Sequence, residues 1–246
     1  MSGESRTLVL TGASRGIGHA TVRRFTEAGW RAVTCSREAV PPEDRRDPNW
    51  SHHIVADLAD PMQRDRFVTE ANHALDGAPL HALVNNAGVS PKTPFKERLG
   101  CLNGDLTAWR AVFELNFFAP LVLARGFAAA LHKGKGAIVN VTSIAGHAAH
   151  PFAGSAYSSS KAALSALTRE MAVEFAELGV RVNAVAPGEI ETAMLSPETE
   201  ELIPRIPLHR LGQPDDVAAT IFYLCTAESS YVTGTEIFVT GGQHLL

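Results

Sequence analysis

Short apolar runs rich in β-branched residues alternate with longer segments of helical period along this chain. Such alternation is typical of a parallel sheet that is covered by helices on both of its faces. The pattern therefore predicts an α/β, doubly wound fold with a single parallel seven-stranded sheet. We expect its strands at residues 7–10, 32–35, 53–56, 82–85, 137–142, 180–186 and 236–239.

The helical segments have recognisable beginnings. We expect helices to start near Gly16, Pro61, Leu106, Ser155 and Pro214. Proline is well suited to the first turn of a helix, and the two aspartates after Pro214 favour its positive end. With 246 residues and no low-complexity linker, the chain is expected to form one domain over residues 1–246.

Composition limits the partners. The formal net charge is −4 and the pI is near 6.2, so we expect no nucleic-acid partner and favour a small-molecule site. Cys35, Cys101 and Cys225 are too widely spaced for a thiolate metal site, and we expect no metal. The amino terminus lacks a secretory signal pattern, and the apolar segment 111–132 contains Glu114 and Arg125. We therefore expect a cytoplasmic protein without a membrane partner, in which segment 111–132 is an amphipathic helix.

A glycine-rich turn, "LVLTGASRGIGHA", follows the first predicted strand and places Gly12, Gly16 and Gly18 before a helix. Glycines let the backbone turn tightly and come close to a pyrophosphate, while free amides at the helix start face the anion. The turn predicts a dinucleotide site.

The end of the second predicted strand, "VTCSRE", bears on which nicotinamide cofactor binds. An acidic residue there would bind a ribose 2′-hydroxyl and repel a 2′-phosphate, but Ser36 occupies that position. Arg15 and Arg37 offer two guanidinium groups to a phosphate, which favours NADP(H). In the alternative interpretation Arg37 is an ordinary solvated residue and Glu38 binds the ribose of NAD(H).

Tyr157 and Lys161 stand four residues apart in "YSSSK", so they face the same way on a helix. A nearby ammonium group and an oxidised nicotinamide ring both favour the phenolate. They are expected to lower the pKa of Tyr157 toward neutral pH, which would let its hydroxyl exchange a proton.

Five motifs together resemble the short-chain dehydrogenase/reductase family, classical type, with similarity to 3-oxoacyl-[acyl-carrier-protein] reductases. They are the glycine turn, "NNAG" at 85–88, Asn116 in "ELNFFAP", Ser143 in "VNVTSIAG" and "YSSSK", and "APGEIET" at 186–192 adds a sixth. The resemblance covers nearly the whole chain and implies a Rossmann fold and hydride transfer between a nicotinamide cofactor and a secondary alcohol or ketone. It implies a catalytic set of Asn116, Ser143, Tyr157 and Lys161, with Tyr157 as general acid/base.

The resemblance also implies further roles. Ser143 would hydrogen-bond the reacting oxygen, Lys161 would hold the nicotinamide ribose, and Asn116 would hold a water in a proton relay. Taken alone, Asn116 would be read as an asparagine that caps or kinks its helix before Pro120, and only the complete set favours the catalytic role. The cofactor-binding set is expected to comprise Gly12, Ser14, Arg15, Gly16, Ile17, Gly18, Arg37, Asp57, Leu58, Asn86, Ala87, Gly88, Tyr157, Lys161, Pro187, Gly188, Ile190 and Thr192. Asn85 and Asn86 also suit a structural role between strands.

Substrate choice is assigned by the resemblance to a lid near residues 189–212, whose mixture of apolar and charged residues argues against a purely apolar pocket. The segment 90–105 is expected to add a wall, with Lys92 or Lys96 nearby. His147 or His150 could orient a polar substrate, although packing or solvent contact explains either residue. The substrate is expected to be a 3-oxoacyl or small polar carbonyl compound, and the assembly a homotetramer. A second hypothesis is a nucleotide-binding regulatory protein that keeps the fold without catalysis.

Overall fold

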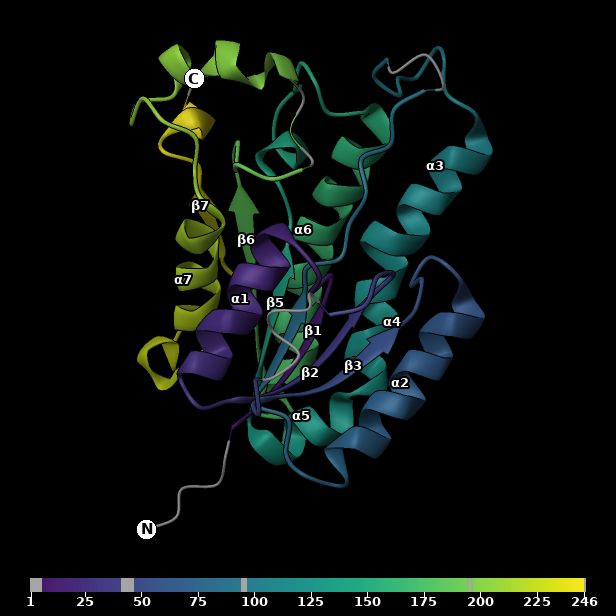
Figure 1. Cartoon of the computed structure of the whole chain (residues 1–246), viewed down its shortest axis with the longest axis vertical. Helices are drawn as coiled ribbons and strands as arrows, with labels where there is room; N and C mark the ends of the chain where they lie inside the picture. The colour runs from purple at the N-terminus through teal and green to yellow at the C-terminus, as the bar shows by residue number, and fades with distance from the viewer. Residues whose placement is uncertain (1–5, 41–46, 94–96, 194, 196, 246) are drawn as a thin grey trace.

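The computed structural model describes residues 6–40, 47–93, 97–193, 195 and 197–245. Seven strands form one parallel sheet in the order β3-β2-β1-β4-β5-β6-β7, as predicted (Figure 1). The strands are β1 (Thr7–Thr11), β2 (Arg31–Ser36), β3 (Trp50–Val55), β4 (Ala82–Asn85), β5 (Ala137–Val141), β6 (Arg181–Pro187) and β7 (Glu236–Val239). The third strand begins three residues before its predicted start because Trp50 is buried and donates a hydrogen bond from Nε1 to Thr34 Oγ1.

Helices cover both faces of the sheet. On one face, α1 (Gly16–Glu27) packs against α7 (Pro214–Cys225), and Phe25 and Ile221 belong to the apolar core beneath them. On the other face lie α2 (Pro61–Leu75), α4 (Ala119–Gly126) and α6 (Ser155–Ala176), over a second core that contains Phe67 and Phe127 (Figure 1). The sheet is therefore buried on both sides, which explains why its strands read as continuous apolar runs.

Helices begin at each of the predicted residues. Asp60 precedes α2 and accepts hydrogen bonds from the backbone N–H groups of Met62 and Gln63, while Pro61 occupies the first turn. At α7, Gln213 and Asp216 satisfy each other's backbone N–H groups on either side of Pro214. These side chains supply partners that the first turn of a helix otherwise lacks, so the local sequence fixes both starts.

The apolar segment predicted as one amphipathic helix over 111–132 is divided. It contains α3 (Leu106–Phe113), a π-helical turn η1 (Glu114–Phe118), α4, and a separate helix α5 (Ala128–Gly134). The chain leaves the helix at Phe127, which is fully buried and packs edge-on against Phe67. Among the described residues, Leu106–Gly126 is long and apolar enough to cross a membrane by length and composition, a test that core helices of soluble proteins also pass.

The strand order creates a crevice at the carboxyl ends of the strands. From β1 the chain moves outward through β2 to β3, and then returns to the other side of β1 at β4. The connections that leave β1 and β4 therefore diverge between two neighbouring strands. In open α/β sheets such a switch point is where ligands bind.

Candidate active site

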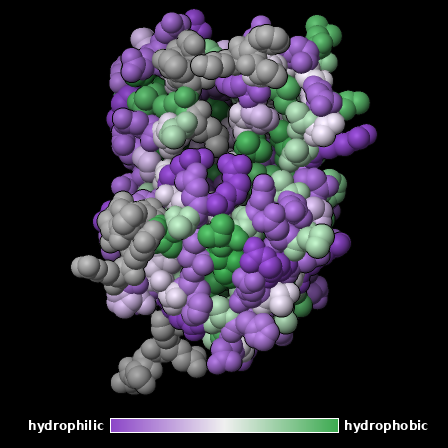
Figure 2. Space-filling model, turned by 45° about the vertical axis from the view of Figure 1, so that its right-hand side comes forward, coloured by the Kyte–Doolittle hydropathy of each residue, from purple (hydrophilic) through white to green (hydrophobic). Residues whose placement is uncertain are grey.

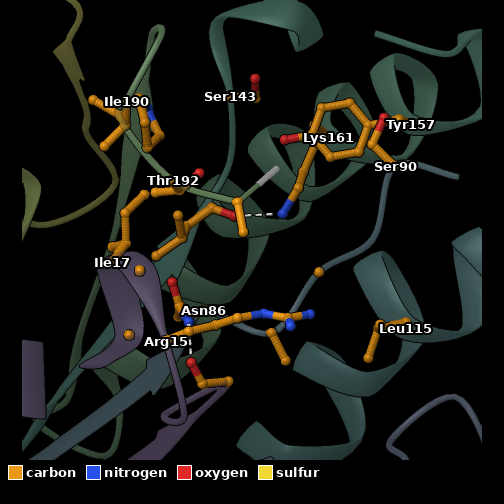
Figure 3. A pocket seen from close by; sticks show the side chains of 18 of the residues that line it. Arg15, Ile17, Asn86, Ser90, Leu115, Ser143, Tyr157, Lys161, Ile190 and Thr192 are labelled. Atoms are coloured by element: carbon orange, nitrogen blue, oxygen red, sulfur yellow. Dashed lines mark hydrogen bonds between the residues drawn. The ribbon is translucent and has the colours of Figure 1, made fainter. Parts of the chain in front are cut away.

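A cavity of about 290 Å³ opens at the carboxyl ends of the strands. Its walls come from the turn after β1, the ends of β2, β4, β5 and β6, and the start of α6 (Figure 3). Every residue of the predicted cofactor set lines this cavity, and so does Ser143. The structure thus brings together in one cleft residues that lie up to 180 positions apart, from Gly12 to Thr192.

The glycine turn has the shape expected of a phosphate cradle. Gly12 and Gly16 have φ angles of +74° and +57°, which side chains rarely adopt. A Cβ atom on Gly18 would stand 2.0 Å from the Gly12 carbonyl oxygen, so only glycine permits this close packing. The first turn of α1 receives no side-chain cap, and its N–H groups are left for an anion. These features fit the pyrophosphate of a dinucleotide.

The end of β2 is organised around Glu38. Its carbonyl oxygen accepts a hydrogen bond from Ser36 Oγ at 2.5 Å and lies 2.8 Å from His53 Nε2. Its carboxylate lies 3.4 Å from Arg15 Nη1, and both side chains of this ion pair are largely exposed. Arg37 is exposed beside them. Both predicted arginines therefore line this end of the cavity, and one of them, Arg15, also pairs with Glu38.

Asn85 and Asn86 tie strands together, as the sequence suggested. Asn85 Nδ2 donates to Asn140 Oδ1 on β5 at 2.8 Å. Asn86 Nδ2 donates to the carbonyl oxygens of Thr11 and Gly12, at 3.0 and 3.1 Å. The side-chain amide of Asn86 thus holds the glycine turn in place, and Asn86 also lines the cavity.

Tyr157, Lys161 and Ser143 converge at one end of the cleft (Figure 3). Tyr157 and Lys161 lie on the same side of α6, with Lys161 Nζ 5.8 Å from the centroid of the tyrosine ring. The Lys161 side chain is 3 % exposed, and its Nζ donates to the Val141 carbonyl oxygen at 2.6 Å. Ser143 follows β5, and its side chain is close enough to that of Tyr157 to favour the tyrosine's ionised form. The predicted phenol, hydroxyl and ammonium therefore form one compact cluster.

The lowering of the Tyr157 pKa was expected from the Lys161 ammonium and an oxidised nicotinamide ring acting together, and the protein's own groups shift this pKa in the other direction. Burial raises the pKa of Tyr157, the Ser143 side chain opposes that rise, and the charge of Glu189 adds to it. Burial also lowers the pKa of Lys161 to about 8. Removal from water disfavours the charged form of both groups.

Asn116 does not line the cavity; it lies directly behind the cavity wall. It is fully buried within η1, where Nδ2 donates to the Val89 carbonyl oxygen and to Ser160 Oγ, both at 3.0 Å. Its Oδ1 accepts from the Val89 N–H at 2.9 Å. A Cβ atom on Gly88 would stand 3.3 Å from Lys161 Nζ and 3.4 Å from Asn116 Oδ1, so both groups flank this glycine.

The sequence analysis missed Glu189 as a site residue. It follows β6 and lines the cavity, and its Oε1 lies 2.7 Å from Nε2 of His150. The one signal for it was a charged residue inside an otherwise apolar "APGEI" segment. His147, the other candidate, pairs instead with Glu236 of β7 at 2.9 Å and does not line the cavity.

Parts of the two predicted substrate walls are also in place. Ser90 and Lys92 line the cavity from the segment after β4, while Lys96 lies outside the described residues. Leu195 and Thr199 line it from the predicted lid, where Met194 and Ser196 also lie outside the described residues. The lid includes a 3₁₀ segment, η3 (Pro197–Arg205).

A doubly wound parallel sheet with a glycine cradle at its switch point defines a nucleotide-binding protein of the Rossmann type. A model of the family described as "Enoyl-(Acyl carrier protein) reductase" matches residues 12–244. With that match and the relatives described next, the chain belongs to the short-chain dehydrogenase/reductase family.

Relatives and solved structures agree with this assignment. "Protein FixR" of Bradyrhizobium diazoefficiens is 54% identical over 99% of this chain and 88% of its own length. The 3-oxoacyl-[acyl-carrier-protein] reductase of Synechocystis is 33% identical over 97% and 96%. A crystal structure of a short-chain dehydrogenase/reductase from Brucella ovis, in complex with a partially ordered NAD, has a TM-score of 0.80 and 49% identity, covering 96% of this chain and 99% of that one.

Proposed function

We propose that this protein interconverts a secondary alcohol and a ketone by hydride transfer with NAD(P), using Tyr157 as general acid/base. The observation that carries the proposal is the cluster of Ser143, Tyr157 and Lys161 beside a glycine cradle in one cleft. A nicotinamide ring bound in that cleft supplies or accepts the hydride. The chain's own residues then have to transfer one proton and stabilise the charge that develops on the reacting oxygen.

Tyr157 is proposed to give a proton to the ketone oxygen during reduction and to remove it from the hydroxyl during oxidation. Ser143 Oγ, which lines the same cavity beside Tyr157, would donate to the same oxygen as charge develops there. The raised pKa keeps Tyr157 protonated at neutral pH but makes the phenol a weaker acid, so the proposal requires nearby positive charge and the Ser143 hydroxyl to bring its pKa toward the working pH.

Lys161 is proposed to bind the nicotinamide ribose, and Lys161 and Asn116 are proposed to take part in the proton relay. Lys161 Nζ uses one of its three donors on the Val141 carbonyl oxygen, which leaves donors for ribose hydroxyls. Asn116 lies beside Lys161 Nζ across Gly88, a position that supports a relay through a bound water. The cradle around Gly12 and Gly16 would hold the pyrophosphate, and Asp57 lines the adenosine end.

Replacing Tyr157 by phenylalanine tests the proposal because the ring stays and only the hydroxyl is lost. Loss of general acid–base catalysis is expected to lower kcat by about 10²–10⁴-fold. Nicotinamide absorbance at saturating cofactor, on a panel of alcohols and ketones, measures it, and quenching of the tryptophan fluorescence by cofactor is expected to stay unchanged. Equal turnover by both proteins would remove Tyr157 from the mechanism. Binding without turnover on a wide panel would favour the alternative of a non-catalytic nucleotide-binding regulatory protein.

For the cofactor we propose a preference for NADP(H), supported by Arg15 and Arg37 at the mouth of the cleft. NAD(H) is the alternative, which the Glu38 carboxylate beside Arg15 and the NAD held by the Brucella ovis relative both favour. The exposed Arg15–Glu38 pair is weak, so a 2′-phosphate dianion is able to displace the carboxylate from the guanidinium.

Glu38→Gln separates the two cofactor readings. If a 2′-phosphate binds the arginines, removing the carboxylate's repulsion should raise kcat/KM for NADPH several-fold and leave NADH use nearly unchanged. If Glu38 instead binds the ribose, wild-type protein should use NADH at least as well as NADPH, and the variant should lose NADH activity. Parallel assays with NADPH and NADH decide between these outcomes.

The finer features of the assembly are proposals as well. We propose a single domain with a substrate lid near 189–212, a 3-oxoacyl or small polar carbonyl substrate, a cytoplasmic location and a homotetramer. Support for an assembly comes from exposed apolar side chains on α3, η1 and α6, namely Leu106, Phe118 and Val173. Figure 2 shows apolar residues gathered in a patch among polar ones on one face of the molecule.

A further inference from the structure

The substrate end of the cavity contains an acid and an imidazole that the proposed mechanism does not use. Glu189 follows β6, and His150 lies in the connection between Ser143 and Tyr157. Their side chains meet at 2.7 Å and are only 10% and 13% exposed, yet both line the cavity. His150 lies between Ser143 and Tyr157 in the chain, and all three line the same cavity.

Backbone hydrogen bonds assign the proton of His150. Its Nδ1 accepts from the N–H groups of Phe152 and Ala153, at 3.3 and 3.2 Å. A nitrogen that accepts two N–H groups has no proton of its own, so the neutral ring carries its proton on Nε2. Nε2 therefore donates to Glu189 Oε1, and the pair keeps the whole negative charge of the carboxylate.

No cation in the described part of the chain neutralises that charge. Lys92 Nζ, the nearest candidate on this wall, donates to the Phe152 carbonyl oxygen, and Lys161 Nζ donates to that of Val141. Within the same described residues, His150 is the side chain found against the Glu189 carboxylate. The charge of Glu189 is felt at Tyr157, whose pKa it helps to raise. With the reacting oxygen at Tyr157, as proposed above, this carboxylate would be near the substrate carbons next to the reacting one.

We propose that Glu189, oriented by His150, determines substrate specificity by accepting hydrogen bonds from hydroxyl groups adjacent to the reacting carbon. The favoured substrates are then uncharged polyhydroxy alcohols and hydroxyketones, and hydroxy or oxo acids with a carboxylate at that position are rejected. A carboxylate accepts but cannot donate, and two like charges in a half-buried site repel each other. The inference rests on the proposed function, because it concerns the substrate of the same site.

Glu189→Gln distinguishes this role from a purely structural clasp. The glutamine carbonyl still accepts the His150 hydrogen bond, so the connection between the two segments is kept while the charge is lost. Substrates are short alditols, each paired with the aldonate anion of the same chain length. We expect the ratio of kcat/KM for alditol over aldonate to fall at least about tenfold, mainly through KM, as expected for a lost charge-assisted hydrogen bond.

Glu191→Gln is the matched control, because Glu191 is in the same connection but is exposed and binds Gln213 at 2.6 Å outside the cavity. It is expected to leave the ratio unchanged. His150→Gln adds a second variant, which should weaken alditol use because the carboxylate loses its orientation. Thermal unfolding of each variant reports on folding.

The outcomes separate the two proposals. If wild-type protein turns over alditols or their ketoses and Glu189→Gln keeps the wild-type ratio, the inference is overturned while the proposed function stands. A wild-type preference for aldonates also overturns it. If wild-type protein turns over nothing and matches Tyr157→Phe, the proposed function fails. In that case, calorimetry measures the binding of each alditol and its paired aldonate to the cofactor-loaded protein. Equal affinity for the two would contradict the proposed role of Glu189 in specificity.

Discussion

Lys161 and Tyr157 are two ionisable groups that the fold removes from water at the point where charge is needed. Lys161 is almost fully buried, and its Nζ donates to the Val141 carbonyl oxygen. Burial lowers the pKa of Lys161 to about 8. An ordinary lysine titrates near 10.5. In the folded protein, Lys161 can therefore release its proton at mildly alkaline pH. This suits a group that is proposed to take part in a proton relay.

This shift has a consequence for stability. Between pH 8 and 10.5 the unfolded chain binds more protons at Lys161 than the folded chain does, so raising the pH across that interval favours the folded state. Below pH 8 the burial penalty is fully present. We expect wild-type protein to gain up to about 3 kcal/mol relative to Lys161→Met as the pH rises through this window.

Urea unfolding of both proteins at several pH values between 7 and 10.5 measures the difference. Using the variant as reference cancels the other titrating groups. Two stability curves that run parallel across this range would mean that Lys161 titrates normally in the folded protein.

Residue roles were partly predictable from the sequence. The residues of the predicted cofactor set all line one cleft, because parallel strands bring their carboxyl ends to one edge, and their contact with a cofactor stays a prediction. The direction of the Tyr157 pKa could not be predicted, since it depends on burial and on Glu189, 32 positions away. The Glu189–His150 pair was equally hidden, because it forms only when two loops meet.

At the scale of elements, the π-helical turn η1 explains how an asparagine comes to lie inside an apolar helix. Asn116 makes two hydrogen bonds with the backbone of Val89 and one with Ser160 of α6. The turn thus joins the end of β4 to the helix that carries Tyr157 and Lys161. Periodicity predicted a helix here, but neither the widened turn nor the break at Phe127 shows in the pattern, because both depend on packing partners far along the chain.

Asn116→Ala tests whether this link serves more than stability. The variant leaves buried backbone groups of Val89 without partners and is expected to lose about 1–3 kcal/mol of unfolding free energy. Asn140→Ala is the matched control, since Asn140 is also fully buried and bonded to Asn85 and Thr168. We expect a similar loss of stability from both variants, but a fall in kcat of about tenfold or more only for Asn116→Ala. Equal kcat values would reduce Asn116 to a structural residue.

At the scale of the whole molecule, the sheet was the most predictable feature, since alternating strand and helix patterns admit few topologies. The assembly was not predictable from these patterns, because it depends on which apolar side chains remain outside. Val173 on α6 is 74% exposed, whereas the sheet edge at β3 leaves Val55 49% exposed. The proposed homotetramer requires that one of these surfaces is covered by another copy of the chain.

Light scattering tests the assembly directly. Wild-type protein is expected to have a mass of about four times the 26.3 kDa of one chain. Val173→Lys should lower that mass by placing a charge in a helix-to-helix interface, while Val55→Lys at the β3 edge of the sheet should leave it unchanged. A monomeric wild-type mass, or dissociation by Val55→Lys alone, would contradict the proposed arrangement.

The widened turn at Glu114–Phe118 also restricts how this chain is able to change in evolution. A π-helical turn contains one residue more than the α-helical turn it replaces, and each helical residue accounts for about 100° of rotation. Deleting Glu114 or Leu115, for example, would favour a regular helix and turn Asn116 away from Val89. Related proteins should therefore tolerate amino-acid substitutions in this turn far more readily than the deletion of a residue.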